Sequence, residues 1–227
     1  MANNQDPKSA LNNTEETLNN QEAFFVKHKN AIVYGVIALI VVIAGFIIYK
    51  SYVSAPREEK ASTVLAKGEA LFGEEQFEAA LNGDKAGYPG FVAIAKDYSS
   101  TAAGNLANLY AGLCYAKMDK WSEAASYLEK FDPQDDSMIS PAAVGALGNA
   151  YAHLNQLDKA VEYLKKAAKK ADNNSLSPTF LIQAGEILES QGKKDEALEL
   201  YKEVKTKYFN SMQYQTIDKY IERATTK

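Results

Sequence analysis

The feature that most restricts the fold is a pattern that recurs every 36 to 37 residues in the second half of the chain. It starts at three glycines, Gly112, Gly148 and Gly185. After each glycine comes a large residue three positions on, an alanine twelve positions on and a leucine or tyrosine sixteen positions on. Unit by unit, these residues are Tyr115, Ala124 and Leu128, then Tyr151, Ala160 and Leu164, then Leu188, Ala197 and Tyr201. Self-similarity at this period is typical of a solenoid of stacked supersecondary units.

Each unit has the pattern of two amphipathic helices joined by a short polar turn. Apolar residues recur at helical spacing on both sides of turns that we place at 117–120, 155–158 and 192–194. The glycine on the first helix and the alanine on the second would let the two backbones approach closely, since neither has a bulky side chain. Pro is scarce, with 6 in 227 residues, which also favours an all-α fold.

The pattern resembles the tetratricopeptide repeat, in which a Leu-Gly pair is followed by Tyr and then by Ala and Phe on the second helix. Leu147-Gly148 with Tyr151 and Ala160 is the best example. The period exceeds the usual length of about 34 residues because extra residues stand between the units, and the usual Trp near the start of each unit is missing. The resemblance covers residues 105–208 and implies three repeats in an α-solenoid.

Two flanking segments complete the predicted solenoid. We interpret residues 50–104 as a membrane-proximal helix followed by a degenerate repeat, which the glycine-rich loop 82–90 interrupts. Residues 209–227 are predicted to form a capping helix that seals the last repeat. Its apolar face would carry Tyr214, Ile217, Tyr220 and Ile221.

Residues 31–49 form an uncharged, apolar run of nineteen residues. As a helix this run would be about 29 Å long, close to the hydrocarbon thickness of a bilayer, so we predict a single transmembrane helix. The alternative is a signal peptide cleaved after Ala55, but Pro56 would hinder cleavage there and the polar leader is long for such a peptide. We therefore favour an uncleaved anchor, preceded by a polar, disordered tail over residues 1–30.

Composition argues against several functional classes. The chain has 25 Lys plus Arg against 29 Asp plus Glu, so it has no excess of cations with which to bind nucleic acid. Two histidines, His28 and His153, and one cysteine, Cys114, supply neither a set of metal ligands nor a catalytic constellation. No phosphate-binding, zinc or hydrolase motif occurs. We predict a protein that is not an enzyme and uses no cofactor or metal.

The resemblance implies a partner-binding groove formed by the first helix of each unit. The candidate residues are Leu106, Leu109, Leu113, Lys117, Asn149, His153, Ile182, Glu186 and Glu189. Repeats of this type that clamp the C-terminal carboxylate of chaperones combine lysines with an asparagine such as Asn149, but here Gly145 and Thr179 stand where lysine would be expected. We therefore expect an apolar or mixed partner segment. The alternative is that some of these residues only pack against a neighbouring helix.

Small residues form one stripe of the predicted span. Ala31, Ala38 and Gly45 lie seven residues apart, with Gly35 beside them. Small side chains let another membrane helix approach closely, so this stripe is a candidate docking face. The alternative is that Ala and Gly are simply common in membrane helices.

The order of parts, a polar leader, one span, a degenerate repeat and three clearer repeats, is similar to the YfgM-type family, the tetratricopeptide subunit that accompanies the bacterial Sec translocon. The stretches at 110–115 and 149–152 resemble members from Bacteroidota-type bacteria. The resemblance implies a bacterial inner-membrane protein with a cytoplasmic N-terminus and periplasmic repeats. Its partners would be translocon subunits, a membrane-anchored prolyl isomerase or chaperone, and exported clients.

Two points stay open at the level of the sequence. Lys27 and Lys29 before the span are balanced by Lys50, Arg57 and Lys60 after it, so the distribution of positive charge does not choose an orientation. The alternative function is a scaffold for envelope assembly or division that has no direct role in secretion.

Overall fold

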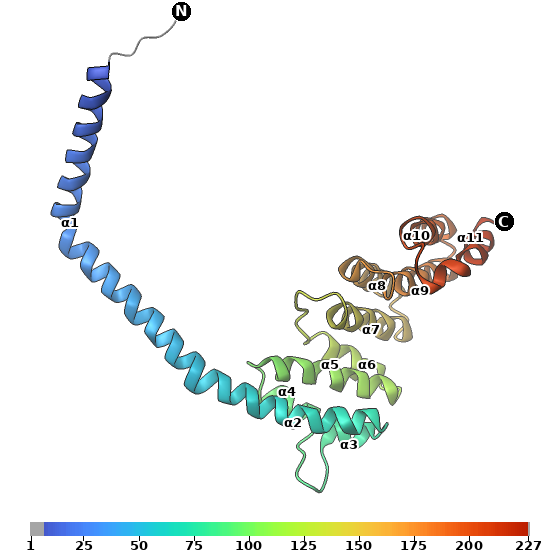
Figure 1. Cartoon of the computed structure of the whole chain (residues 1–227). Coiled ribbons are helices and arrows are strands. Elements are labelled where there is room, and N and C mark those ends of the chain that lie inside the picture. Colours follow the sequence, from blue (N-terminus) through green and yellow to red (C-terminus); the bar gives the residue numbers. More distant parts are fainter. Residues whose placement is uncertain (1–6, 227) are drawn as a thin grey trace, which may run out of the picture. The chain divides into compact units, whose positions relative to one another are not determined.

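The computed structural model describes residues 7–226, which form two compact units that meet between Pro56 and Arg57. Every regular element in this described part is a helix (Figure 1). The expected all-α fold is confirmed.

The first unit is one long helix, α1 (Pro7–Tyr49), followed by a π-helical turn, η1 (Lys50–Ser54). Its most apolar 18-residue window has a mean hydropathy of 3.0, and none of that window is buried against protein. A bare helix of this kind is long and apolar enough to cross a membrane.

Helix α1 extends well into the segment for which the sequence predicts a disordered tail. It begins at Pro7, so residues 7–30 are helical, and only residues 1–6 of the predicted tail lie outside the described part. Proline at the first helical position is favourable, since its missing N–H has no partner there in any helix. Extending an existing helix fixes only one residue for each added hydrogen bond, whereas starting a new one is costly.

Pro56 accounts for the π-helical turn. A proline inside an α-helix lacks an N–H and its ring clashes with the carbonyl four residues earlier, here that of Tyr52. In η1 the Ala55 N–H bonds to the carbonyl of Lys50, five residues back. This wider turn accommodates the proline without ending the helical path.

The second unit contains the solenoid. Its helices are α2 (Ala55–Gly73), α3 (Phe77–Asn82), α4 (Phe91–Asp97), α5 (Ala102–Lys117), α6 (Trp121–Leu128), α7 (Ile139–His153), α8 (Leu157–Ala171), α9 (Ser177–Ser190), α10 (Lys194–Lys207), the 3-10 turn η2 (Met212–Gln215) and α11 (Ile217–Thr225). The pairs α5/α6, α7/α8 and α9/α10 are the three predicted repeats, stacked in chain order (Figure 1).

The repeated glycines lie where the two helices of each pair touch. In each unit a Cβ on the glycine would collide with the residue sixteen positions later. The distances would be 2.6 Å from Gly112 to Leu128 Cγ, 2.9 Å from Gly148 to Leu164 Cγ and 2.3 Å from Gly185 to Tyr201 Cε1. Contacts below 3.0 Å cannot be accommodated without a shift, so the spacing of sixteen is imposed by helix packing.

A fourth glycine of the same kind lies in α2, within the segment for which the sequence predicts a degenerate repeat. A Cβ on Gly68 would be 2.0 Å from the Tyr88 hydroxyl oxygen and 2.5 Å from Phe91 Cε1. Ala80 follows Gly68 by twelve residues and is fully buried, as in the other units. The loop between α3 and α4 displaces the sixteenth residue, and Tyr88 and Phe91 fill its place. Helices α2, α3 and α4 therefore form the interrupted repeat.

The turns between paired helices repeat as well. Each contains one residue with positive φ: Glu75, Asp119, Asn155 and Gly192, with φ between 57° and 76°. These residues follow the four glycines by seven positions every time. The left-handed conformation closes the tight turn, and glycine adopts it without steric cost.

The first and the last helix of the solenoid each make contacts that hold them to the neighbouring repeat. At the start of α2, the Glu58 carboxylate accepts hydrogen bonds from the amides of Ala102 (2.7 Å) and Ala103 (3.0 Å), the first residues of α5. At the other end, α11 buries Ile217 and Ala224 against the last repeat. Tyr214, however, is 40% exposed and lies in η2 before this helix, where its N–H bonds to the Ser211 hydroxyl.

Candidate partner groove

The predicted groove residues come from the first helices of the three repeats, and the structure separates them into three sets. Leu106, Leu109 and Leu113 of α5 line one cavity, and Leu113 with Lys117, Asn149 and His153 lines another. Ile182, Glu186 and Glu189 of α9 lie in neither cavity. Leu109 and Ile182 are only 8% and 7% exposed, so these two mainly pack against neighbouring helices.

We call the first cavity the apolar pocket. It encloses about 350 Å³ between α2, α5 and α7, and its lining residues are Glu69, Leu106, Leu109, Tyr110, Leu113, Met138, Ile139, Ala142 and Ala143. Met138 and Ile139 are more than half exposed although both are large and apolar. Glu69 is the one charged residue of this lining. Burial, followed by the nearby Glu69 carboxylate, raises the pKa of Tyr110.

We call the second cavity the polar pocket. It encloses about 440 Å³ and is lined by Leu113, Ala116, Lys117, Trp121, Ala146, Asn149, Ala152, His153 and Gln183. Within the described part of the chain, the Asn149 side chain makes no hydrogen bond and Lys117 forms no ion pair. Because Leu113 lines both cavities, they adjoin, and we call the two cavities together the groove.

An aromatic stack, not foreseen from the sequence, closes one wall of the polar pocket. The rings of Trp121 and His153 lie 3.6 Å apart at an angle of 4°. The histidine ends α7 and the tryptophan begins α6. The imidazole is therefore fixed against the indole, and the stack presents a flat, rigid surface to anything that enters the pocket.

The two glutamates of α9 are held by the capping helix. Arg223 of α11 forms a hydrogen-bonded ion pair with Glu189 and lies 3.9 Å from Glu186. The Tyr201 hydroxyl also donates to Glu189, at 3.0 Å, and burial followed by this carboxylate raises the pKa of Tyr201. Arg223 thus offsets one of the two negative charges and engages Glu189 inside the chain, whereas Glu186 stays exposed.

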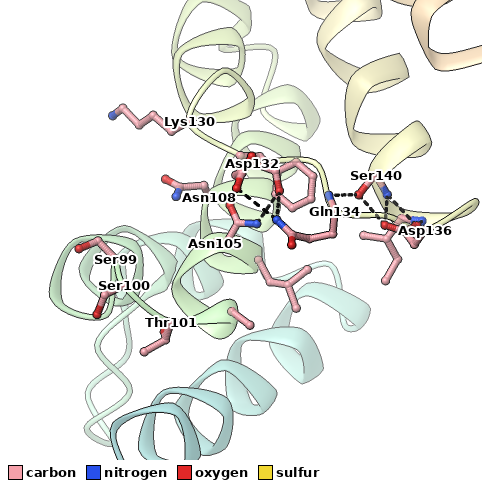
Figure 2. A pocket seen from close by; sticks show the side chains of 14 residues that line it. Ser99, Ser100, Thr101, Asn105, Asn108, Lys130, Asp132, Gln134, Asp136 and Ser140 are labelled. Atoms are coloured by element: carbon pink, nitrogen blue, oxygen red, sulfur yellow. Dashed lines mark hydrogen bonds between the residues drawn. The ribbon is translucent and has the colours of Figure 1, made fainter. Parts of the chain in front are cut away.

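A third cavity, of about 600 Å³, lies over the loop between α6 and α7 (Figure 2). The polar groups on its loop side bond to one another. Asn105 exchanges two 2.8 Å hydrogen bonds with the Asp132 main chain. Asp136 accepts from the first amides of α7 and from the Ser140 hydroxyl, which lowers the pKa of Asp136 to about 2. These groups cap α7 and fix the loop, so the cavity is a structural feature.

The small-residue stripe of α1 remains open in the first unit. Ala31, Gly35, Ala38 and Gly45 are all exposed. A Cβ on Gly35 or Gly45 would meet no atom within 4 Å. The stripe is therefore accessible to another membrane helix.

Chemically reactive groups are sparse in the part of the chain that the structure describes. No group of three His, Cys, Asp or Glu side chains is placed to hold a metal ion there. Cys114 is fully buried, and burial raises the pKa of its thiol to about 12, so the thiol stays protonated at neutral pH.

Comparisons with known proteins agree with this geometry. The model of the family described as "Tetratricopeptide repeat-like domain" matches residues 22–217. The crystal structure of MamA protein has a TM-score of 0.50 and 17% identity, over 73% of this chain and 90% of that one. The nearly identical TPR-like repeats assigned to a kinesin light chain of Podosopora anserina also give 0.50, with 15% identity over 75% and 84%. No curated protein matches the sequence significantly. At these identities the structural likeness shows the fold alone.

Proposed function

Because the chain belongs to the tetratricopeptide repeat-like domain family, whose fold is that of a protein-interaction adaptor, we propose that it is an ancillary subunit of the Sec translocon. In this proposal the protein is anchored in the inner membrane of a bacterium and links the translocon to a periplasmic chaperone or prolyl isomerase and to exported clients. The N-terminus is cytoplasmic and the repeats are periplasmic. The resemblance to the YfgM-type family supports these details.

One observation carries the proposal most directly. The family match begins at residue 22, before the apolar segment of α1, and ends at residue 217, after the last repeat. The membrane-crossing candidate and the solenoid therefore belong to one family unit. A binding groove that is permanently linked to a membrane helix suits a protein whose partners also reside in or emerge from the membrane.

The stripe of small residues on α1 and the groove would bind different partners. The stripe of Ala31, Gly35, Ala38 and Gly45 would dock against a membrane helix of the translocon, since its small side chains permit close approach. The groove would hold a periplasmic partner or client. Linking both contacts in one chain raises the effective concentration of the second after the first has formed.

Photo-crosslinking in native membranes tests the proposal. Photoreactive side chains would replace Leu113, Lys117 and Asn149, which line the groove, and Glu203 on the exposed face of α10 as the control. We expect translocon subunits, a periplasmic isomerase or exported chains to be captured from groove positions and not from the control. Capture of envelope-assembly or division proteins alone would refute the secretion function and favour the scaffold.

The orientation of the protein in the membrane needs a separate measurement, because the positive charges on the two sides of the apolar segment of α1 do not predict it. A single cysteine at Asp195, in a chain whose buried Cys114 is replaced by Ala, would be exposed at the start of α10. We expect a membrane-impermeant maleimide to label it in spheroplasts with an intact inner membrane. Labelling only after lysis would place the repeats in the cytoplasm and exclude the periplasmic proposal.

A further inference from the structure

The apolar pocket and the polar pocket differ in a way that restricts what the groove can hold. The apolar pocket combines two half-exposed apolar side chains, Met138 and Ile139, with a single carboxylate, Glu69. An apolar side chain gains most by covering such exposed carbon surface. A cation next to it would lie against Glu69, whereas an anion there would be repelled.

The polar pocket favours a main chain whose own hydrogen-bonding groups are free. The amide oxygen of Gln183 is buried and accepts no hydrogen bond within the described chain. Asn149 in the same lining also has an unused amide. Because the Gln183 oxygen is itself buried, a partner in the pocket cannot reach it, and the partly exposed Asn149 amide is the group that can pair with a peptide main chain. An extended segment offers backbone N–H groups, but the interior of a helix does not.

We propose, building on the adaptor function above, that the groove binds an extended protein segment in which a branched apolar residue stands next to Lys or Arg. The apolar side chain enters the apolar pocket, the cation pairs with Glu69, and the adjoining main chain hydrogen-bonds to the Asn149 amide. Charge complementarity at Glu69 selects a cation over an anion beside the apolar side chain, whereas Lys117 lines the separate polar pocket and does not contribute to this position. Most residues that line the groove are apolar or uncharged. The charge preference of the groove therefore depends on a few individual side chains.

Peptide binding by the full chain tests this specificity. The protein would be placed in nanodiscs of zwitterionic lipid, and fluorescence anisotropy would follow three labelled peptides that contain Leu-Lys-Ile, Leu-Gln-Ile or Leu-Glu-Ile between Gly-Ser flanks. Empty nanodiscs supply the background. We expect the lysine peptide to bind most tightly and the glutamate peptide most weakly, with about threefold to tenfold between the two, as partly exposed charge pairs allow.

Amino-acid substitutions test which residues determine the preference among the three peptides. Glu69→Lys should reverse the order of the lysine and glutamate peptides, whereas Glu59→Lys should leave it unchanged. Glu59 lies exposed on the same helix outside the groove lining and is therefore the matched control. Ile139→Ser should weaken all three peptides several-fold. Asn149→Leu should weaken them equally without loss of thermal stability, because it removes an amide that has no hydrogen-bond partner within the described chain.

The outcomes separate this inference from the adaptor function. An unchanged peptide order in Glu69→Lys, or no binding of any peptide by the unaltered chain, would overturn the basic-apolar specificity. The adaptor function would survive that result if groove positions still capture partners in membranes. Failure of both experiments would overturn both proposals.

Discussion

Replacing Gly148 by alanine is the most direct test of how the repeats pack. The new methyl group would lie 2.9 Å from Leu164 Cγ, 3.1 Å from the Leu164 amide nitrogen and 3.3 Å from the Ala160 carbonyl oxygen. Two of these three atoms belong to the backbone of α8, so rotation of one side chain cannot relieve the contact. The two helices must move apart.

The magnitude follows from two opposing effects. Alanine is more favourable than glycine inside a helix by about 1 kcal/mol. Overpacking a tight core costs about 1–3 kcal/mol. Taking the upper part of that range because backbone is involved, we expect a net loss of about 1–2 kcal/mol, or a fall in Tm of about 2–8 °C for a domain of this size.

The assay is thermal unfolding of the full chain in detergent, followed by circular dichroism at 222 nm. The matched control is Gly73→Ala at the end of α2, where a Cβ would meet nothing within 4 Å, and we expect no fall in Tm there. Leu164→Ala should cost less in the Gly148→Ala background than alone, because it removes the clashing side chain. Equal or higher stability of Gly148→Ala would refute the assigned helix contact.

The remaining predictions concern the helix cap, the C-terminal ion pair and the span. Asp136→Ala should reduce stability at pH 7 by about 1 kcal/mol. Folding lowers the pKa of Asp136 from its usual 3.8 to about 2, so the unaltered chain should lose the stability that this carboxylate contributes as the pH falls from about 4 to 2. Measuring Tm across this pH range would show the loss. Arg223→Met should lower Tm by a few degrees at low salt and by less at high salt, since Glu189 loses its partner and ions screen the pair. Gly35→Leu with Gly45→Leu should abolish co-purification of membrane partners, and unchanged co-purification would remove the docking stripe.

The repeats could be predicted from the sequence because close packing of the paired helices fixes the spacing of the residues that touch. A glycine and the side chain sixteen positions later must meet wherever two helices cross at this distance, so Gly112, Gly148 and Gly185 were found by spacing alone. Gly68 makes the same contact but was missed. The insertion between α3 and α4 moves its partners, Tyr88 and Phe91, away from the regular position.

The groove was less predictable, because which side chain is free depends on contacts between elements far apart in the chain. Glu189 looked available until α11 placed Arg223 beside it, 34 residues later. The stack of Trp121 on His153 likewise joins two repeats. Met138 and Ile139 stand where the loop after α6 meets the start of α7, which no repeat pattern describes, yet they supply much of the exposed apolar surface of the apolar pocket.

The size of the groove sets the affinity that any partner segment can reach. Burying one leucine-sized side chain in the apolar pocket contributes about 1.5–3 kcal/mol, and the exposed pair with Glu69 adds about 0–1 kcal/mol. A hydrogen bond to the Asn149 amide adds about 1 kcal/mol more. Since a dissociation constant of 1 mM corresponds to about 4 kcal/mol, a short free segment should bind only near the millimolar range. The effective concentration of a partner that is docked beside α1 is also about millimolar. The groove would therefore be about half-occupied when the partner is docked and nearly empty when the partner is free in solution. The weakness of the groove would therefore make occupancy depend on docking through α1, and disrupting the stripe should reduce groove crosslinks without altering the affinity for free peptide.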